Sequence, residues 1–234
     1  MKHNAFRYIL IAAATALLTS CLPESDYMFT DTGMYTLAGH NRLQADSGDI
    51  YIITENRTGE EIPDTLKRVM AICDVLSQVE GKEHEYKVRL NDFAEALCKA
   101  PLAREDMDEA AVGNDGVNIN QAWSTGGYIN AHISYAVLPS SKKAHMVNLI
   151  YDSVRSHSDT LFFELRHNAF GECPENTEHP LNSFVFASAY TSFPISDLVG
   201  NGKPVIHLEW DWYDGDEYVF RREKIRRQGN IPLN

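Results

Sequence analysis

Glu164 and His167 come closest in this sequence to the residue types and spacing of an acid–base or metal-binding pair. Residues three apart share a face on a helix, but on a strand they point to opposite faces. Apolar side chains alternate here at Leu161, Phe163 and Leu165, which is typical of a strand. The pattern therefore predicts that the pair does not converge. It places His167 on the apolar side, as a core histidine bonded to a carbonyl group.

The other polar groups give no clearer metal motif. His132, His145 and His207 lie on separate segments without H-x-H spacing, so we expect no metal site from them. Four acids surround a later Asp-Gly turn: Asp211, Asp214, Asp216 and Glu217. This cluster lacks the spacing and length of a calcium-binding loop, so it predicts a solvated turn. We expect neither a metal ion nor a cofactor.

Nucleophilic catalysis finds little support in the sequence. There is no G-x-S-x-G, S-x-x-K or H-E-x-x-H motif. Cys73 follows the apolar alternation of a buried strand, and Cys173 has an acidic neighbour that would raise its pKa. A glycan hydrolase remains an alternative, because two carboxylates among Glu164, Glu209 and Asp211 could face each other across a cleft. We expect no catalytic residue.

The chain begins with the features of a secretory signal over residues 1–20. A cationic start precedes an apolar stretch, 8–18. This stretch is too short to span a bilayer, which takes about 20 apolar residues. Its end, Leu18-Thr-Ser-Cys21, resembles a lipobox, so Cys21 is predicted to carry the lipid as the first mature residue. Residues 21–33 are predicted to be a tether. The tether has no Asp after Cys21, which favours the outer membrane; the periplasmic and surface faces both stay open.

Composition narrows the function further. The net charge of −12 becomes −14 when residues 1–20 are removed, since they hold two cations and no acid. An acidic protein repels nucleic acid and anionic lipid headgroups, so we exclude a nucleic-acid partner. Three cysteines follow Cys21, namely Cys73, Cys98 and Cys173. None forms C-x-x-C, which argues against a zinc knuckle or a thioredoxin-like site.

Turn-bounded runs of β-branched and aromatic residues predict strands in the first half, including 49–54 and 86–90. Residues 62–76 are ambiguous, because their apolar positions fit a strand alternation over 69–75 and also a helical stripe. Residues 101–122 are polar with little periodicity, and we expect an exposed linker and a domain boundary there.

The second half has β patterns throughout. An Asp-Gly turn after Tyr213 predicts a hairpin, because this dipeptide suits the tight turns that join antiparallel strands. Strands with turns at regular intervals suggest an antiparallel sandwich. The expected strands are 128–137, 145–151, 161–167, 183–190, 204–212 and 217–225.

Five motifs spread along the chain form a recognisable set: Arg68–Asp74, Ala96–Lys99, Trp123–Asn130, His145–Asp152 and Phe163–Ala169. Together they resemble the NigD-like lipoproteins of Bacteroidetes. The resemblance implies an all-β protein, with a small OB-like barrel over 34–108 followed by an Ig-like antiparallel β-sandwich over 109–234. It favours a strand for 62–76 and places Cys73 and Cys98 in one barrel, where we expect free thiols, a disulfide being the alternative. It implies no molecular activity.

The sequence thus predicts a lipid-anchored envelope protein that binds a partner and catalyses nothing. Its partners would be the lipid bilayer, through acylated Cys21, and an envelope protein or glycan of unknown identity. A cell-envelope glycan hydrolase and a bacteriocin-associated accessory protein are the alternatives.

Overall fold

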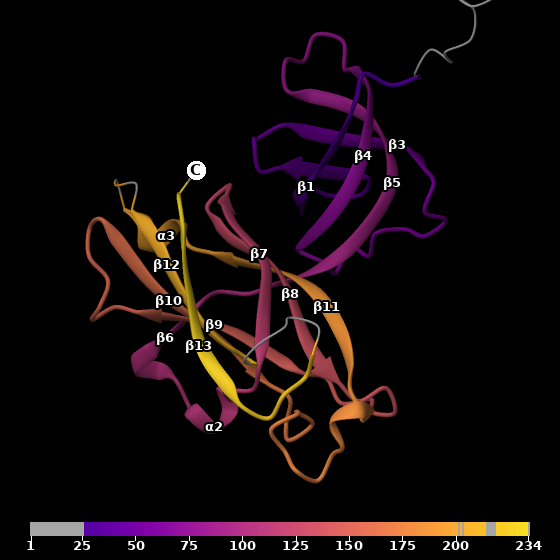
Figure 1. Ribbon diagram of the computed structural model, residues 1–234. Coiled ribbons are helices and arrows are strands. Elements are labelled where there is room, and N and C mark those ends of the chain that lie inside the picture. Colours follow the sequence, from indigo (N-terminus) through magenta and orange to yellow (C-terminus); the bar gives the residue numbers. More distant parts are fainter. Residues whose placement is uncertain (1–25, 201, 203, 214–218, 234) are drawn as a thin grey trace, which may run out of the picture.

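The computed structural model describes residues 26–200, 202, 204–213 and 219–233 (Figure 1). Cys21, the predicted signal segment and residues 22–25 of the predicted tether lie outside these residues, as do Asp214, Asp216 and Glu217 of the acidic cluster. The rest of the predicted tether is described, and its residues 29–33 belong to the first strand instead. The described chain is all-β, as predicted, with only one-turn helices between strands. No helix in this part of the chain is long and apolar enough to cross a membrane.

The N-terminal half is a small five-stranded β unit, called the barrel below. Its antiparallel strands follow the order β3-β2-β1-β4-β5, and β3 also pairs in parallel with β5, so the series returns on itself. The side chains that point inward form one apolar cluster, which includes Tyr35, Leu43, Val69 and Leu90. The strands are β1 (Phe29–Leu37), β2 (Arg42–Ala45), β3 (Ile50–Asn56), β4 (Arg68–Gln78) and β5 (Glu85–Cys98).

The ambiguous segment 62–76 is resolved by β4, which confirms the strand interpretation from residue 68 onward. Val69, Ala71, Cys73 and Val75 are all buried in the barrel core, as the alternation predicted. The helical stripe was misleading because the apolar residues Met70 and Ile72, between the buried ones, point to the outer face of the same strand.

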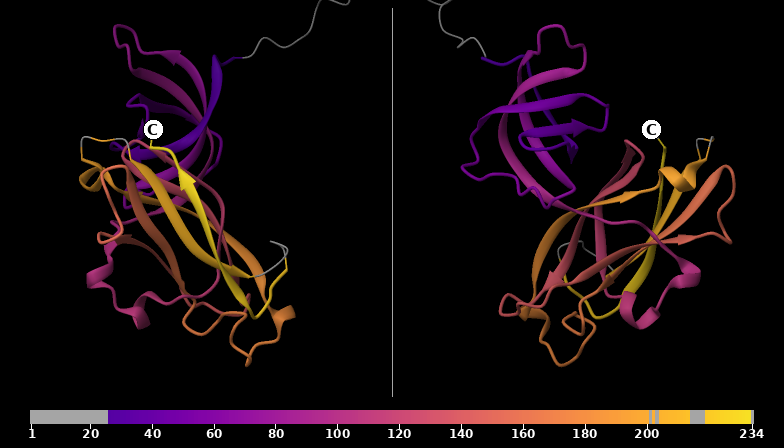
Figure 2. Two further views of the ribbon diagram at one scale, coloured as in Figure 1. Left: turned by 60° about the vertical axis from the view of Figure 1, so that its left-hand side comes forward. Right: turned by 180° about the vertical axis from the view of Figure 1, so that it is seen from behind.

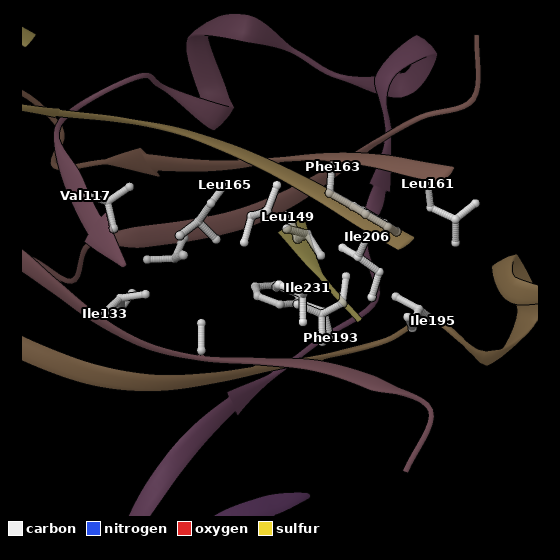
Figure 3. Close-up of a cluster of buried hydrophobic side chains, with 14 residues drawn as sticks. Val117, Ile133, Leu149, Leu161, Phe163, Leu165, Phe193, Ile195, Ile206 and Ile231 are labelled. Atoms are coloured by element: carbon white, nitrogen blue, oxygen red, sulfur yellow. The ribbon is translucent and has the colours of Figure 1, made fainter. Parts of the chain in front are cut away.

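The C-terminal half is a β-sandwich whose two sheets enclose a second apolar cluster, shown in Figure 3. One layer holds β7 (Val117–Thr125), β8 (Tyr128–Val137) and β11 (Val185–Pro194). The other layer has the order β13-β12-β10-β9-β6. Its strands are β6 (Leu102–Ala103), β9 (Met146–Asp152), β10 (Thr160–Asn168), β12 (Val205–Tyr213) and β13 (Lys224–Ile231).

The two halves share one sheet. The end of the long strand β5 pairs in parallel with β11, from Ala96 opposite Tyr190 to Cys98 opposite Ser192. The eight-stranded sheet β3-β2-β1-β4-β5-β11-β8-β7 therefore runs through both halves, and Figure 1 shows β5 leading from the barrel toward β11.

The sandwich is not purely antiparallel. β10 and β12 pair in parallel, as do β6 and β9. The chain leaves β10, crosses to the other layer as β11 and returns as β12. Two reversals restore the original direction, so β10 and β12 run the same way. This departs from the expected antiparallel arrangement because neighbours in this sheet are not neighbours in sequence.

Two local expectations were wrong. Residues 101–122 are not an exposed linker, since they contain β6, the short helices η1 (Arg104–Asp106) and α2 (Glu109–Val112), and the start of β7. Of the strand expected at 217–225, the described residues 219–223 are not in a strand, and β13 begins at Lys224, where it pairs antiparallel with β12. The domain boundary after residue 108 falls at the start of α2 and stays a prediction.

Candidate functional site

Glu164 and His167 lie on opposite faces of β10, as the strand interpretation predicted. His167 joins the face of Leu165 inside the sandwich, whereas Glu164 lies on the outer face of the second sheet. Both side chains are buried. Glu164 is buried although it lies on the outer face, because arginine side chains cover it. The pair therefore cannot act on one substrate or one metal ion.

Three guanidinium groups surround the Glu164 carboxylate. The Glu164 oxygens accept hydrogen bonds from Arg104 at 2.7 Å, Arg226 at 2.8 Å and Arg166 at 3.0 Å. Burial alone would raise the pKa of Glu164, but the bonds from Arg104 and Arg166 and the charge of Arg226 outweigh it and bring the pKa to about 2. Glu164 is thus held as an anion.

The other two carboxylates of the hydrolase alternative lie on the same face, on β12. Glu209 accepts a bidentate pair of bonds from Arg155 at 2.6 and 3.1 Å, and Asp211 contacts Arg226 at 2.6 Å. The hydrogen bond from Arg155 lowers the pKa of Glu209 against the effect of burial. A general acid in a glycosidase needs a raised pKa and a partner across a cleft. The three acids sit side by side on one sheet and are neutralised by arginines.

His167 has the carbonyl partner that the sequence predicted. Its Nδ1 lies 3.1 Å from the carbonyl oxygen of Gly116, and its Nε2 lies 3.0 Å from Nδ1 of His145. Since Nδ1–H must donate to the carbonyl, Nε2 accepts from His145, and the His167 ring is neutral. Burial, followed by the charge of His145, lowers the pKa of His167 to about 4, and burial also lowers that of His145. This buried pair is structural.

The other two candidate histidines, His132 and His207, lie away from this buried pair. His132 stacks on Tyr190 with ring centroids 4.8 Å apart, on the outer face of the long sheet. His207 lies on the outer face of the second sheet, between Asn230 and Glu209. The contact between His145 and His167 was missed by the sequence, because His145 precedes its strand and carries no spacing signal.

All three described cysteines are free thiols, which confirms the expectation for Cys73 and Cys98. On the β4–β5 hairpin Cys73 lies opposite Leu90, eight residues before Cys98, so the two cannot reach disulfide distance. Burial raises the pKa of Cys73, and likewise that of Cys173, to about 12. Neither thiol is a ready nucleophile.

Cys173 lies near two carboxylates, with its sulfur and oxygens of Asp115 and Glu175 all within 4.8 Å of one another. Donors from the protein already occupy these carboxylates. Glu175 accepts from Tyr213 at 3.1 Å and pairs with Lys224 at 3.0 Å. Asp115 accepts from a backbone amide at 2.7 Å. The cluster is therefore explained by its internal hydrogen bonds.

The junction of the two halves is built around Arg68, whose side chain is 1% exposed. Its guanidinium forms a bidentate pair with Asp46 at 2.8 and 3.0 Å and lies 3.9 Å from the centre of the Tyr128 ring. Thr125 donates to the same Asp46 carboxylate at 2.6 Å, and Asn130 accepts from Arg68 at 3.4 Å. Arg68 and Asp46 come from the barrel and the others from the sandwich, so the cluster ties the halves together.

This junction explains the Gly-Gly-Tyr-Ile-Asn motif. Gly126 has a φ of 58°, and a Cβ atom there would lie 2.8 Å from the carboxyl carbon of Asp46. Only glycine allows both the left-handed conformation and the close approach. The motif therefore serves the contact between the halves.

The Glu-Leu-Arg-His-Asn-Ala motif has a comparable structural task. Arg166 donates to the carbonyl of Gly113 at 2.7 Å, and Asn168 donates to carbonyl groups in α2. The amide of Ala169 donates to Asp115 at 2.7 Å. These bonds fasten the segment 104–116 to β10, which is why it is not a linker.

The described surface also carries an apolar hollow. This hollow of about 150 Å³, called the trough below, crosses the outer face of the long sheet where the barrel meets β11. Ile72 on its wall is 36% exposed. The trough is lined by Thr32, Met70, Ile72, Asp92, Phe93, Ala94 and Tyr190.

The sequence carries a signal for the trough. Residues 69–73 are apolar without a break, so β4 is apolar on both faces, although only one faces the barrel core. A strand apolar on both faces is either covered twice or exposes apolar side chains. Tyr190, in contrast, carried no local signal, because its place beside Ala96 depends on the distant pairing of β5 with β11.

Comparison with known proteins agrees with this architecture. The family model of the NigD-like C-terminal beta sandwich domain matches residues 100–222. The search of curated proteins found no match.

Three of the solved structures with the same fold come from Bacteroides species. One is a protein of unknown function from Bacteroides vulgatus, with 19% identity, a TM-score of 0.62, and coverage of 88% of this chain and 92% of that chain. A NigD-like immunity protein from Bacteroides caccae has 18% identity, a TM-score of 0.59, and coverage of 86% and 91%. A candidate lipoprotein from Bacteroides fragilis has 13% identity, a TM-score of 0.60, and coverage of 88% and 99%. These identities establish a common fold only.

Proposed function

The chain belongs to the NigD-like family, whose C-terminal β-sandwich model matches more than half of it, and from that premise we propose that it is a lipid-anchored, non-catalytic binding protein of the cell envelope. The anchor is Cys21, at the end of a lipobox-like sequence that follows an apolar segment. The similarity to the candidate lipoprotein from Bacteroides fragilis supports this part of the proposal. The tether sequence favours the outer membrane.

A non-catalytic role is supported by the state of the polar clusters. The carboxylates of Glu164, Glu209 and Asp211 are each paired with an arginine. The lowered pKa values of Glu164 and Glu209 make these two poor proton donors. His167 is neutral and enclosed, and the thiols of Cys73 and Cys173 have raised pKa values. Each cluster has a structural explanation, and none faces an open cleft as a reacting group would.

The observation that carries the binding role is the trough. Its volume of about 150 Å³ is below the roughly 300 Å³ or more that enclosed ligand pockets need. An open apolar hollow of this size suits a side chain that belongs to a larger partner. We infer that the partner is a protein segment, which would place an apolar side chain between Ile72 and Tyr190.

Site-specific photocrosslinking in the producing cells tests this role. A photoreactive amino acid at Ile72 should give a discrete crosslinked adduct, whereas the same residue at Val154, which is 88% exposed on a sandwich loop, should not. Tyr190→Ala should weaken the Ile72 adduct without unfolding the protein. Equal yields at both positions would contradict the proposal.

A further inference from the structure

The chain enters the barrel at the end that is far from the sandwich. β1 starts at Phe29, opposite Val75 near the end of β4, whereas the junction lies at the start of β4, where Arg68 is opposite Ala96. These two ends of β4 are seven residues apart, or about 23 Å at 3.3 Å per residue. Figures 1 and 2 show the first described residues and the turn between β4 and β5 at the same outer end of the barrel.

The chain is also fixed at that end. The carboxylate of Asp26 forms a bidentate pair with Arg89, at 2.6 and 3.0 Å, and Arg89 contacts Glu55 at 2.6 Å as well. Five residue steps separate Cys21 from Asp26, and they span at most about 18 Å when fully extended. An acylated Cys21 would therefore keep this end of the barrel within reach of the bilayer surface.

Two large apolar side chains stand exposed at this point. Met28 is 60% exposed and Phe29 is 46% exposed, immediately after the clamped Asp26. They lie at the start of β1, where the amide of Met28 already donates to Val75, so their backbone is held in place. Apolar and aromatic side chains close to an anchor point favour the boundary between headgroups and acyl chains.

We propose that the outer end of the barrel rests on the lipid bilayer through Met28 and Phe29. The barrel then acts as a spacer that directs the sandwich away from the membrane and leaves the trough open to partners. This inference rests on the proposed acylation of Cys21. The occupant is a zwitterionic lipid surface, because a mature chain with a net charge of −14 is repelled by anionic headgroups.

Lipid quenching of fluorescence tests the proposal. The full acylated chain is reconstituted into phosphatidylcholine vesicles that contain headgroup-nitroxide lipid, with a fluorescent amino acid at Lys82 in the β4–β5 turn. A second sample carries it at Glu178, in the connection between β10 and β11, which lies at the far end of the sandwich (Figures 1 and 2). We expect quenching at Lys82 to exceed quenching at Glu178 at least threefold.

A double variant distinguishes the effect of the apolar contact from the effect of the lipid tether. Met28→Ser combined with Phe29→Ser should remove at least half of the quenching at Lys82, whereas Val154→Ser should leave it unchanged. Vesicles rich in anionic lipid should also give weaker quenching at Lys82. Equal quenching at Lys82 and Glu178, or no loss in the double variant, would overturn the inference while flotation with the vesicles still supports the anchor. A chain that does not float would overturn the anchor and the inference together.

Discussion

The junction around Arg68 and the outer surface around Glu164 both place arginines against carboxylates, but they distribute the charge differently. At the junction one guanidinium serves Asp46 and Asn130 across the boundary between the halves. Around Glu164, several arginines contact several acidic side chains. Arg226, for example, contacts both Glu164 and Asp211. A cluster with one cation depends on that residue, whereas a shared network can compensate for a loss.

The largest effect is expected from Arg68→Ala. This change leaves Asp46 without its cation and opens the junction, which should lower the free energy of unfolding by about 4 kcal/mol. Urea unfolding followed by tryptophan fluorescence and circular dichroism should then show separate transitions for the two halves. Arg68→Lys, which keeps the charge without the bidentate geometry, should give a smaller loss. A single transition at the wild-type midpoint would show that the junction does not depend on Arg68.

His167→Ala should cost about 3 kcal/mol, since it removes a buried hydrogen bond and leaves a cavity. The pKa of His167 is about 4 in the folded protein and near 6.5 when unfolded, so protonation favours the unfolded state. Its contribution is fully present above pH 6.5 and is lost as the pH falls toward 4.

Urea midpoints at pH 7.5 and pH 5 measure this effect. When the pH falls from 7.5 to 5, the wild-type protein should lose more stability than the His167→Gln variant does. A wild-type protein and a variant with the same pH dependence would contradict the assignment of His167 as a buried neutral group.

Glu164→Gln should cost about 2 kcal/mol, less than the loss of Arg68. The amide keeps one acceptor, and the arginines retain other acids, such as Asp152 for Arg104 at 2.9 Å. Stability between pH 4.5 and pH 2 should also become less pH-dependent, because the depressed pKa of Glu164 stabilises the fold above this range. Thermal melts across that range measure it. A loss as large as that of Arg68→Ala would break the distinction between the two regions.

The smallest effect is expected from Arg226→Ala. Its side chain is partly exposed, and exposed ion pairs contribute less than about 1 kcal/mol. The melting temperature should fall by no more than a few degrees, with most of the difference gone in high salt. A destabilisation that matches Glu164→Gln would show that the network is not shared.

The parts of this molecule that were predictable from sequence are the local ones. Alternation at Leu161, Phe163 and Leu165 assigned both faces of β10, and with them the burial of His167 and the separation from Glu164. The same kind of pattern was ambiguous for β4, because apolar residues occupy both of its faces. The resemblance to a family resolved that case.

The remaining features depend on contacts between distant residues. Neither the parallel pairing of β10 with β12 nor the closeness of Tyr190 to Ala96 leaves a mark in the local sequence. Segment 101–122 has a polar composition because its side chains and backbone are bonded to β10, so a pattern of polarity was mistaken for a linker. The local sequence around Arg68 is that of an ordinary strand and does not indicate its partner Asp46.

The anchor at Cys21 underlies both the proposed envelope location and the proposed membrane contact of the barrel, and intact mass spectrometry of the membrane fraction tests this anchor most directly. The wild-type chain should begin at Cys21 and carry the added mass of a diacylglycerol group and an acyl chain. Cys21→Ser should accumulate as a precursor that retains residues 1–20 and carries no lipid. A membrane-bound Cys21→Ser chain with the lipidated wild-type mass would contradict the anchor, and so would a wild-type chain that begins elsewhere without lipid.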